Sequence, residues 1–151
     1  MNIKETLEAL AKLEGVKDTG LIRKRVGYLE IEKENILDIA TKIKDDLQFD
    51  HCVCISAVDY QTEFEIVYHF SRINDDAEML EMRTILPRDT PTIDSIAELW
   101  GGADWHEREA YDLMGIYFIG HPNLKRVLLP DGFAGHPLRK DYVYEIHEEE
   151  W

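Results

Sequence analysis

Apolar residues recur every three or four positions near the start of the chain, which predicts an amphipathic helix. Asn2 followed by Glu5 forms a capping-box pattern at the start of this helix, and Gly15 suits the left-handed position that ends one. Its apolar face comprises Leu7, Leu10 and Leu13. A short strand is predicted over 26–31, and a second helix follows it. The apolar face of the second helix comprises Ile36, Ile39, Ala40, Ile43 and Leu47.

Three later segments have the patterns of β-strands. Residues 51–58 (HCVCISAV) are almost continuously apolar, which favours a central strand covered on both faces. Apolar and polar residues alternate over 64–70, and residues 78–86 supply a further strand. Helical spacing then returns in Ile93, Ile96, Ala97 and Trp100. The order α-β-α-β-β-β-α predicts an α+β fold, with an antiparallel or mixed sheet covered by helices.

A charged helix is predicted over residues 104–114. Asp104 followed by Glu107 forms a second capping-box pattern, and Gly115 should end the helix. One arc of the helix is apolar, with Ala110, Tyr111, Leu113 and Met114. The opposite arc carries Arg108, Glu109 and Asp112. Glu107 falls inside the apolar arc, where the third position of a capping box would place it whatever its function.

Trp105 falls on the charged arc. Burying an aromatic side chain gains about 2 kcal/mol, so we expect either the following segment or another protein to cover this ring. Arg108 and Asp112 are four residues apart and can pair on an exposed helix, but such a pair contributes only about 0.3 to 0.5 kcal/mol. Stability alone therefore does not account for the density of charge.

After Gly115 the sequence keeps neither a strand period nor a helix period, and Gly and Pro recur every few residues. Such a long segment is usually functional or held by something else, which predicts an extended C-terminal arm. The segment between Gly115 and Tyr144 contains four basic and two acidic residues. Its charge is therefore 4 − 2 = +2, in a chain whose net charge is −14. This asymmetry favours docking over a solvated loop. We expect an α+β domain over 1–100 and, packed with it as one unit, the charged helix and docking arm over 101–151.

The net charge of −14 argues against nucleic acid or an anionic lipid surface as the main partner. No apolar stretch approaches the roughly 20 residues that cross a bilayer, and the N-terminal segment does not look like a secretory signal. We therefore expect a chain of the cytoplasm. Cys52 and Cys54 would share one face of an extended strand but lie too close in sequence for an ordinary disulfide, which predicts a reduced, buried pair.

Catalysis by this chain finds little support in its motifs. Glu107 and Glu109 project about 200° apart on a helix and cannot act together on one substrate atom. The HERE segment lacks the second histidine of a zinc-peptidase motif, because Ala110 stands there. His121 and His136, each in a GHP turn, are the remaining metal-ligand candidates, and a freestanding metal-binding enzyme is the rival hypothesis.

Residues 103–142 closely resemble the 30-kDa subunit family of respiratory complex I, also known as its C-subunit family. The first signature is met by Glu107, Arg108, Glu109, Asp112, Leu113, Met114, His121, Pro122, Lys125, Val127 and Leu128. A second motif, Gly-His-Pro-Leu-Arg-Lys-Asp, stands at 135–141. The resemblance is looser over AVDY and EIVYHF upstream. Similar subunits occur in complexes that oxidise reduced coenzyme F420 or ferredoxin, and in membrane-bound NiFe hydrogenases.

The resemblance implies a non-catalytic, hydrophilic subunit of a membrane-bound, ion-translocating NADH:quinone oxidoreductase. The subunit would lie peripherally on the cytoplasmic side of the membrane and dock on the large quinone-site subunit. It would bind no cofactor itself, while partner subunits carry iron–sulfur clusters. The residues expected at the partner interface are Trp105, Glu107, Arg108, Glu109, Asp112, His121, Pro122, Lys125, Arg126, His136, Pro137, Arg139, Lys140 and Asp141.

Overall fold

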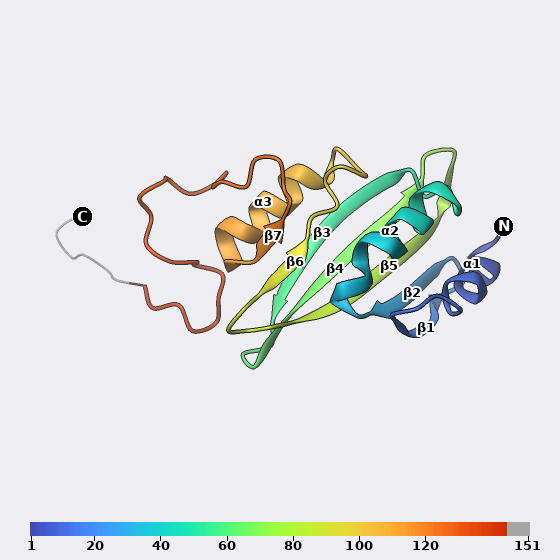
Figure 1. Ribbon diagram of the computed structural model, residues 1–151, viewed down its shortest axis with the longest axis horizontal. Helices are drawn as coiled ribbons and strands as arrows, with labels where there is room; N and C mark the ends of the chain where they lie inside the picture. The colour runs from blue at the N-terminus through green and yellow to red at the C-terminus, as the bar shows by residue number, and fades with distance from the viewer. Residues whose placement is uncertain (145–151) are drawn as a thin grey trace.

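A computed structural model of the chain describes residues 1–144, with the backbone alone at residues 75–77 (Figure 1). The last residues of the predicted arm, 145–151, lie outside the described part. The helices are α1 (Ile3–Leu10), η1 (Lys33–Asn35, a 3-10 turn), α2 (Ile36–Asp45) and α3 (Ala103–Met114). The strands are β1 (Val16–Arg23), β2 (Val26–Ile31), β3 (His51–Asp59), β4 (Glu63–Arg72), β5 (Asp75–Pro87), β6 (Thr92–Asp94) and β7 (Tyr117–Ile119).

The main sheet has five strands in the order β1-β2-β5-β4-β3. Strand β2 pairs parallel to β5, and the other neighbours pair antiparallel, so the sheet is mixed. A second, two-stranded sheet joins β6 to β7 in parallel. The predicted α+β fold, with a mixed sheet covered by helices, is confirmed.

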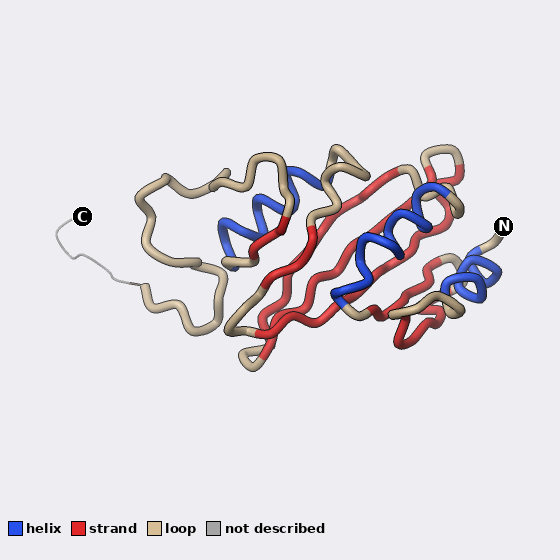
Figure 2. The backbone as a smooth tube through the Cα atoms, in the orientation of Figure 1, coloured by secondary structure: helices blue, strands red, loops and turns tan. Residues whose placement is uncertain are grey.

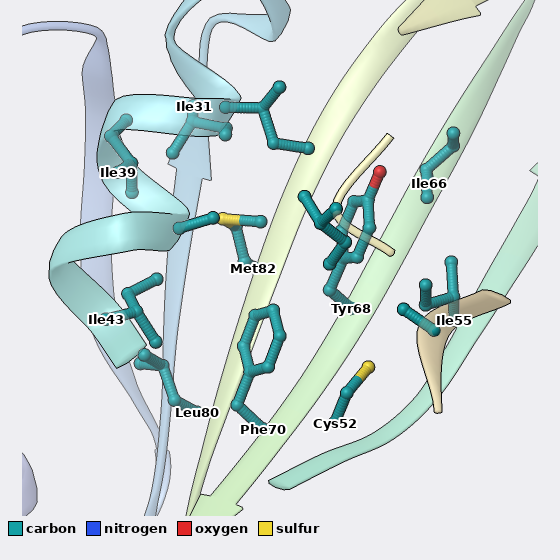
Figure 3. Packing of buried hydrophobic residues seen from close by; sticks show 14 of the residues in the cluster. Ile31, Ile39, Ile43, Cys52, Ile55, Ile66, Tyr68, Phe70, Leu80 and Met82 are labelled. Carbon is teal, nitrogen blue, oxygen red and sulfur yellow. The ribbon is translucent and has the colours of Figure 1, made fainter. Parts of the chain in front are cut away.

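Helices α1 and α2 pack on one face of the sheet (Figures 1 and 2). The spacing of buried Ile39 and Ile43 turns one side of α2 toward Leu80 and Met82 on β5, as Figure 3 shows. Helix α1 approaches β2 so closely that a Cβ on Gly27 would lie 2.8 Å from the Leu7 side chain. Glycine at this position therefore lets α1 reach the sheet.

Helix α3 and the segment after β7 lie at the opposite end of the molecule from the N-terminus (Figure 1). Residues 120–144, called the arm from here on, form turns and irregular structure beside α3. Trp100 anchors the connection into α3, because its ring stacks on Phe70 at 4.5 Å and its Nε1–H donates to the Phe49 carbonyl at 3.0 Å. The site described below is therefore held against the main core.

The N-terminal helix begins at Asn2 as predicted, and the capping box with Glu5 is present at 2.8 to 3.1 Å. It ends at Leu10 and not at Gly15, however, because the chain leaves the helix in tight turns that still place Leu13 against the core. Strand β1 follows, and the sequence did not predict it. Its side chains are half-buried or exposed, so it lacks the clear alternation of a buried strand.

Strand β3 was expected at the centre of the sheet, and that prediction is wrong, because β3 is an edge strand. Its inward face contributes Cys52 and Ile55 to the core, and α3 packs on that same face through Ala110 and Met114. The outer face also carries apolar residues, Cys54 and Val58, which are only half-buried. These outward residues gave an edge strand the composition that is typical of a central one.

The helix predicted from Ile93 to Trp100 is also absent. Residues Thr92–Asp94 form β6, and the Ile96 carbonyl then accepts hydrogen bonds from Leu99 and Trp100 in a turn. Ile93, Ile96 and Trp100 are buried as the spacing required, but a strand followed by a turn buries them. Across the part of the chain that the structure describes, every helix is too short or too polar to cross a membrane.

Candidate functional site

Asp112, on the last turn of α3, organises the first part of the arm. Its fully buried carboxylate accepts hydrogen bonds from the backbone N–H groups of Val127, Leu128 and Leu129 at 3.2, 2.8 and 2.9 Å. Arg126 Nη1 donates to the same carboxylate at 3.0 Å. Burial alone would raise the pKa of Asp112, but the backbone donors and Arg126 outweigh it and hold that pKa below its ordinary value. Hydrogen bonds from residues 126–129 therefore stabilise the negative charge of Asp112.

Two arginines complete this contact through backbone carbonyls. Arg108 Nε donates to the Lys125 carbonyl and its Nη2 to the Arg126 carbonyl, both at 3.1 Å. Arg126 Nη2 reaches further along the arm, to the carbonyls of Phe133 and Gly135 at 3.1 Å. A planar guanidinium has several donors in fixed directions, so each arginine joins two carbonyls at once.

Arg108 and Asp112 were expected on an exposed arc of the helix, where they could pair with each other. That expectation is wrong, since both are buried by the arm and each bonds to arm residues. A helical-wheel projection shows only which residues share a face. It cannot show that residues 125–129, later in the chain, will cover that face.

Glu107 is buried at the other end of α3 and holds the turn before the helix. One carboxylate oxygen accepts from the Ile96 N–H at 2.8 Å and the other from the Ser95 hydroxyl at 2.5 Å. Burial raises the pKa of Glu107 to about 7, against the hydrogen bonds from Ser95 and Ile96, which lower it. The capping-box interpretation is wrong, because Gly102 is the N-cap and Asp104 lies inside the first turn.

His121 closes the same end of the site from the arm. Its Nε2–H points at the carbonyl and carboxylate of Asp104, at 3.1 and 3.2 Å, and lies 3.8 Å from Glu107. Its Nδ1 accepts from the Asn123 N–H at 2.9 Å. Asn123 thereby fixes which ring nitrogen carries the proton. The first GHP turn therefore fixes the start of the arm to the first turn of α3.

The second GHP turn closes the C-terminal end of α3. His136 Nδ1–H donates to the Asp112 carbonyl at 2.9 Å, and Arg139 Nε donates to the Met114 carbonyl at 2.7 Å. Gly115 ends the helix in the left-handed conformation as predicted, with φ of 74°. A Cβ there would lie 2.6 Å from Arg139 and from the His136 ring. Donors thus meet the last carbonyls of α3, where the helix dipole favours positive charge.

The end of the arm is tied to the main sheet through Asp59, which sequence reasoning missed. Asp59 is buried at the end of β3, forms an ion pair with Arg88 and accepts from the Lys140 N–H at 2.8 Å. Arg88 also pairs with Asp141 at 3.0 Å. The hydrogen bond from Arg88 holds the pKa of Asp59 well below its usual range. The only signal was an acidic residue ending an apolar strand, in the AVDY segment.

Trp105 stays 61% exposed on the outer side of α3. Of the two covers expected for this ring, the arm is excluded and a protein partner stays a prediction, while Arg108 stacks over the ring at 4.6 Å from its centroid. Leu128 and Leu138 are also exposed on the arm. Leu138 also lines, with Leu113 and Glu109, a shallow groove of about 160 Å³ between α3 and β3. The exposed members of the predicted interface are Glu109, Pro122, Lys125, Lys140 and Asp141, and Pro137 is half-buried.

The predicted interface residues fall into two groups. One group faces inward. Glu107 joins α3 to the turn before it, and the others join α3 to the arm: Arg108, Asp112, His121, Arg126, His136 and Arg139. The other group, with Trp105, remains available on the surface. Among the residues described, no three side chains of the His, Cys, Asp or Glu type gather in a way that could hold a metal ion. The inward residues thus fix the backbone of the arm, and the outward residues form a surface that another protein can contact.

Comparison with known proteins gives concordant matches. The family model described as "Respiratory-chain NADH dehydrogenase, 30 Kd subunit" matches residues 29–148. The C subunit of the NADH-quinone oxidoreductase of Citrifermentans bemidjiense is 44% identical over 80% of this chain and 76% of its own length. The C subunit of the F(420)H(2) dehydrogenase of Methanosarcina mazei is 43% identical over 74% of this chain and 72% of its own length.

One relative is much longer than the chain. The C subunit of the NADH-quinone oxidoreductase of Chloroherpeton thalassium is 44% identical over 72% of this chain, and the match spans only 47% of that protein.

Solved structures share the fold. A trypsin-resistant fragment of Nqo5, residues 1–134, superposes with a TM-score of 0.70 at 26% identity, covering 82% of this chain and all of the fragment. A chain of the membrane-bound sulfane sulfur reductase, an archaeal respiratory membrane complex, superposes with a TM-score of 0.81 over 93% of this chain and 85% of that one. Its identity is 22%, so this second likeness concerns the fold alone.

Proposed function

The chain belongs to the family of the 30 Kd subunit of respiratory-chain NADH dehydrogenase, and on that premise we propose that it is a non-catalytic docking subunit of a membrane-bound, ion-translocating oxidoreductase. It binds the large quinone-site subunit through the outer side of α3 and the arm, and it supports assembly of the electron-transfer arm. The redox centres, including iron–sulfur clusters, belong to the partner subunits. The chain itself lies peripherally on the cytoplasmic side of the membrane.

The exposure of Trp105 supports this proposal most directly. A large ring that is 61% exposed forgoes about 1 to 2 kcal/mol of favourable burial, which a protein partner would supply. Tryptophan and arginine are enriched among the residues that dominate protein interfaces, and here Arg108 lies over the ring. Leu128 and Leu138 add further exposed apolar area on the arm.

The rigidity of the arm is the second support. A segment without helix or strand would normally lose conformational entropy on binding a partner. Here Asp112 and Arg108 already fix it through five hydrogen bonds to the backbone of residues 125–129. A partner therefore meets a surface that is ordered in advance.

The choice of electron donor lies outside this chain. Its identity to an NADH-quinone oxidoreductase subunit, 44%, and to an F(420)H(2) dehydrogenase subunit, 43%, is nearly equal. What the two relatives have in common is a place in a respiratory complex. The alternative is that the chain is a subunit of a membrane-bound hydrogenase and uses the same surface to bind its large subunit. The identity of the co-purified large subunit decides between the two kinds of complex.

Co-purification tests the proposal. The tagged full chain, recovered from mildly solubilised membranes of its own organism, should bring down a large quinone-site or hydrogenase-type subunit. Trp105→Ala should reduce that recovery about tenfold or more, because truncation of a central interface tryptophan costs roughly 2 kcal/mol or more. Ile73→Ala is the matched control, since Ile73 is 67% exposed in the β4–β5 turn at the other end of the molecule.

The isolated Trp105→Ala chain should unfold at the same urea concentration as the native chain, because the ring has little cover to lose. Undiminished recovery of the large subunit with Trp105→Ala would count against this surface. Failure of the native chain to recover any such subunit would count against the function itself.

A further inference from the structure

The two cysteines of β3 lie on opposite faces of the sheet. Cys52 pairs in register with Phe70 and Cys54 with His69, so an irregularity at residue 53 takes up one extra residue of β3. Without it, residues two apart would share a face. The expectation that both cysteines are buried together is therefore wrong, although both are free thiols as expected.

Cys52 points into the core beside Phe70 and Ile55, as Figure 3 shows. Burial raises the pKa of this thiol to about 12. The thiolate is the nucleophilic form of cysteine, so Cys52 is chemically inert in the folded chain. Cys52 therefore serves as an internal control for the reactivity of Cys54.

Cys54 lies on the outer face, at one end of a row of three side chains on three adjacent strands. Its Sγ is 3.4 Å from His69 Nδ1 on β4, and His69 Nε2 is 3.1 Å from Glu81 Oε2 on β5. Sheet register sets this row, because His69 pairs directly with Cys54 on one side and with Glu81 on the other. Arg83 donates to the second oxygen of Glu81 and fixes that carboxylate.

The row has a definite direction for proton transfer. The Glu81 carboxylate, held by Arg83, can only accept, so His69 Nε2 carries the hydrogen of the Nε2–Glu81 contact. Nδ1 of the neutral ring is then an acceptor that faces the Cys54 thiol. A nucleophile, a base and a group that orients the base stand in line, which is the arrangement that activates nucleophilic cysteines.

Reagents in solution can reach this row. The outward-facing residues of β4 are half-buried, whereas the inward-facing ones are buried under the helices. The His69 side chain keeps 24% of its exposure and Cys54 is half-buried. The register places further charged or titratable residues on the same face: Asp18, Arg23, Tyr28, Glu30, His51, Glu63, Glu65 and Arg83, and Lys17 lines a groove with Glu30, Glu65 and Arg83. Among the described residues, α1 and α2 lie on the opposite face (Figure 1).

We propose that Cys54 is a modification site that undergoes thiol–disulfide exchange with small disulfides, with His69 as its base and Glu81 as the residue that positions His69. The Cys54 sulfur gives its proton to His69 Nδ1 and attacks one sulfur of the disulfide R–S–S–R. A new S–S bond forms between Cys54 and one R–S group as the old S–S bond breaks. The leaving R–S⁻ takes the bonding electron pair and then the proton from His69. Cys54 is oxidised, and half of the disulfide is reduced.

Charge selects among small disulfides. The chain carries −14 overall, and on this face the carboxylates of Asp18, Glu30, Glu63, Glu65 and Glu81 outnumber the cations Lys17, Arg23 and Arg83. A cationic disulfide is therefore attracted and an anionic one repelled. Cystamine and glutathione disulfide serve as the cationic and anionic probes.

The test measures adduct formation on the full chain with cystamine, by intact mass and peptide mapping, between pH 6 and pH 9.5. Native chain should form one mixed disulfide, at Cys54, and react faster with cystamine than with glutathione disulfide at low salt. At pH 6.5, His69→Gln should slow the reaction about tenfold, because the Cys54 thiol then has no neighbouring base to take its proton. The difference should vanish above pH 9, where thiols ionise without a base.

Three variants make the result interpretable. Cys54→Ser should abolish the adduct, Cys52→Ala should leave its rate unchanged, and Glu81→Ala should slow it about threefold to tenfold at pH 6.5. Equal rates for native and His69→Gln chains at pH 6.5 would overturn the proposal. A slowing by His69→Gln that is constant across the pH range would also overturn it, because altered packing and not proton transfer would then be its cause. Modification at Cys52 would do the same.

Discussion

Asp112 and Arg126 form an ion pair at 3.0 Å in which the carboxylate is fully buried and the guanidinium largely so. The pair links the last turn of α3 to the start of the arm. The same carboxylate accepts three backbone N–H groups, so most of its lone pairs are in use. Buried charges that are both paired and hydrogen-bonded are costly to disrupt.

Asp112→Ala should therefore destabilise the chain by about 3 to 5 kcal/mol, since it leaves Arg126 and three N–H groups without their acceptor. Urea unfolding of the full chain measures the change. Asp131→Ala is the matched control, because Asp131 is an exposed acid in the same arm and should change the stability by no more than about 0.5 kcal/mol. A shift for Asp112→Ala as small as that of the control would contradict the described role.

Glu107 should make stability depend on pH. Its pKa is about 7 in the folded chain against 4.5 for an ordinary glutamate, so the folded state binds more protons between these values. A raised carboxyl pKa contributes stability that is full below pH 4.5 and is lost as pH rises through about 7. The loss is about 3 kcal/mol, from 1.36 kcal/mol per unit over 7 − 4.5 = 2.5 units.

Glu107→Gln should remove this dependence, so the native chain loses stability relative to the variant as pH rises from 5 to 8. Urea unfolding at four pH values measures the difference. Asp104 and His121 face the same carboxylate and are unchanged in both proteins. Glu109→Gln, at an exposed position on the same helix, should show no such trend. A stability difference between Glu107→Gln and native chain that is flat with pH would refute the assignment.

Gly115→Ala should destabilise the chain by about 1 to 3 kcal/mol. The left-handed φ of 74° disfavours any Cβ, and this one would lie 2.6 Å from Arg139 and the His136 ring. Displacing Arg139 also exposes the Met114 carbonyl. Thermal unfolding should show a loss of roughly 2 to 4 °C per kcal/mol. Gly132→Ala has open space around its Cβ and should be nearly neutral.

Asp59→Ala should release the end of the arm while leaving α3 in place. Its carboxylate holds the Lys140 N–H and Arg88, and Arg88 in turn holds Asp141. Brief digestion with trypsin should then cleave after Arg139 or Lys140 at least several times faster than in native chain. Asp89→Ala, an exposed acid beside Arg88, is the control. Unchanged cleavage in Asp59→Ala would show that other contacts hold the arm.

The sequence predicted those features in which local pattern and burial agree. Strand β2 matches its predicted bounds, and α2 was found because Ile39 and Ile43 face the core at regular spacing. Gly115 was recognised because ending a helix is a local property of one residue. The features that failed depend on long-range contacts. Strand β1 has no buried face of its own, and Ile93 and Trp100 belong to a strand and a turn that happen to repeat a helical spacing.

For the site, the sequence found the residues but not their arrangement. Arg108 and Asp112 were singled out correctly as unusual, yet whether they face solvent or the arm depends on where residues 125–129 fold. Asp59 was missed because its partner Lys140 lies 81 residues away. The row of Cys54, His69 and Glu81 was likewise hidden, because an extra residue in β3 reverses the face that simple alternation predicts.

Helix α3 holds residues 127–129 of the arm by their main-chain N–H groups, and it holds Lys125 and Arg126 through their carbonyls. Any amino acid except proline supplies these groups at 127–129. The shape of the arm is thus insulated from the identity of outward side chains such as Leu128. A change of the Leu128 side chain should therefore alter the surface that meets a neighbour without altering the path of the backbone beneath it.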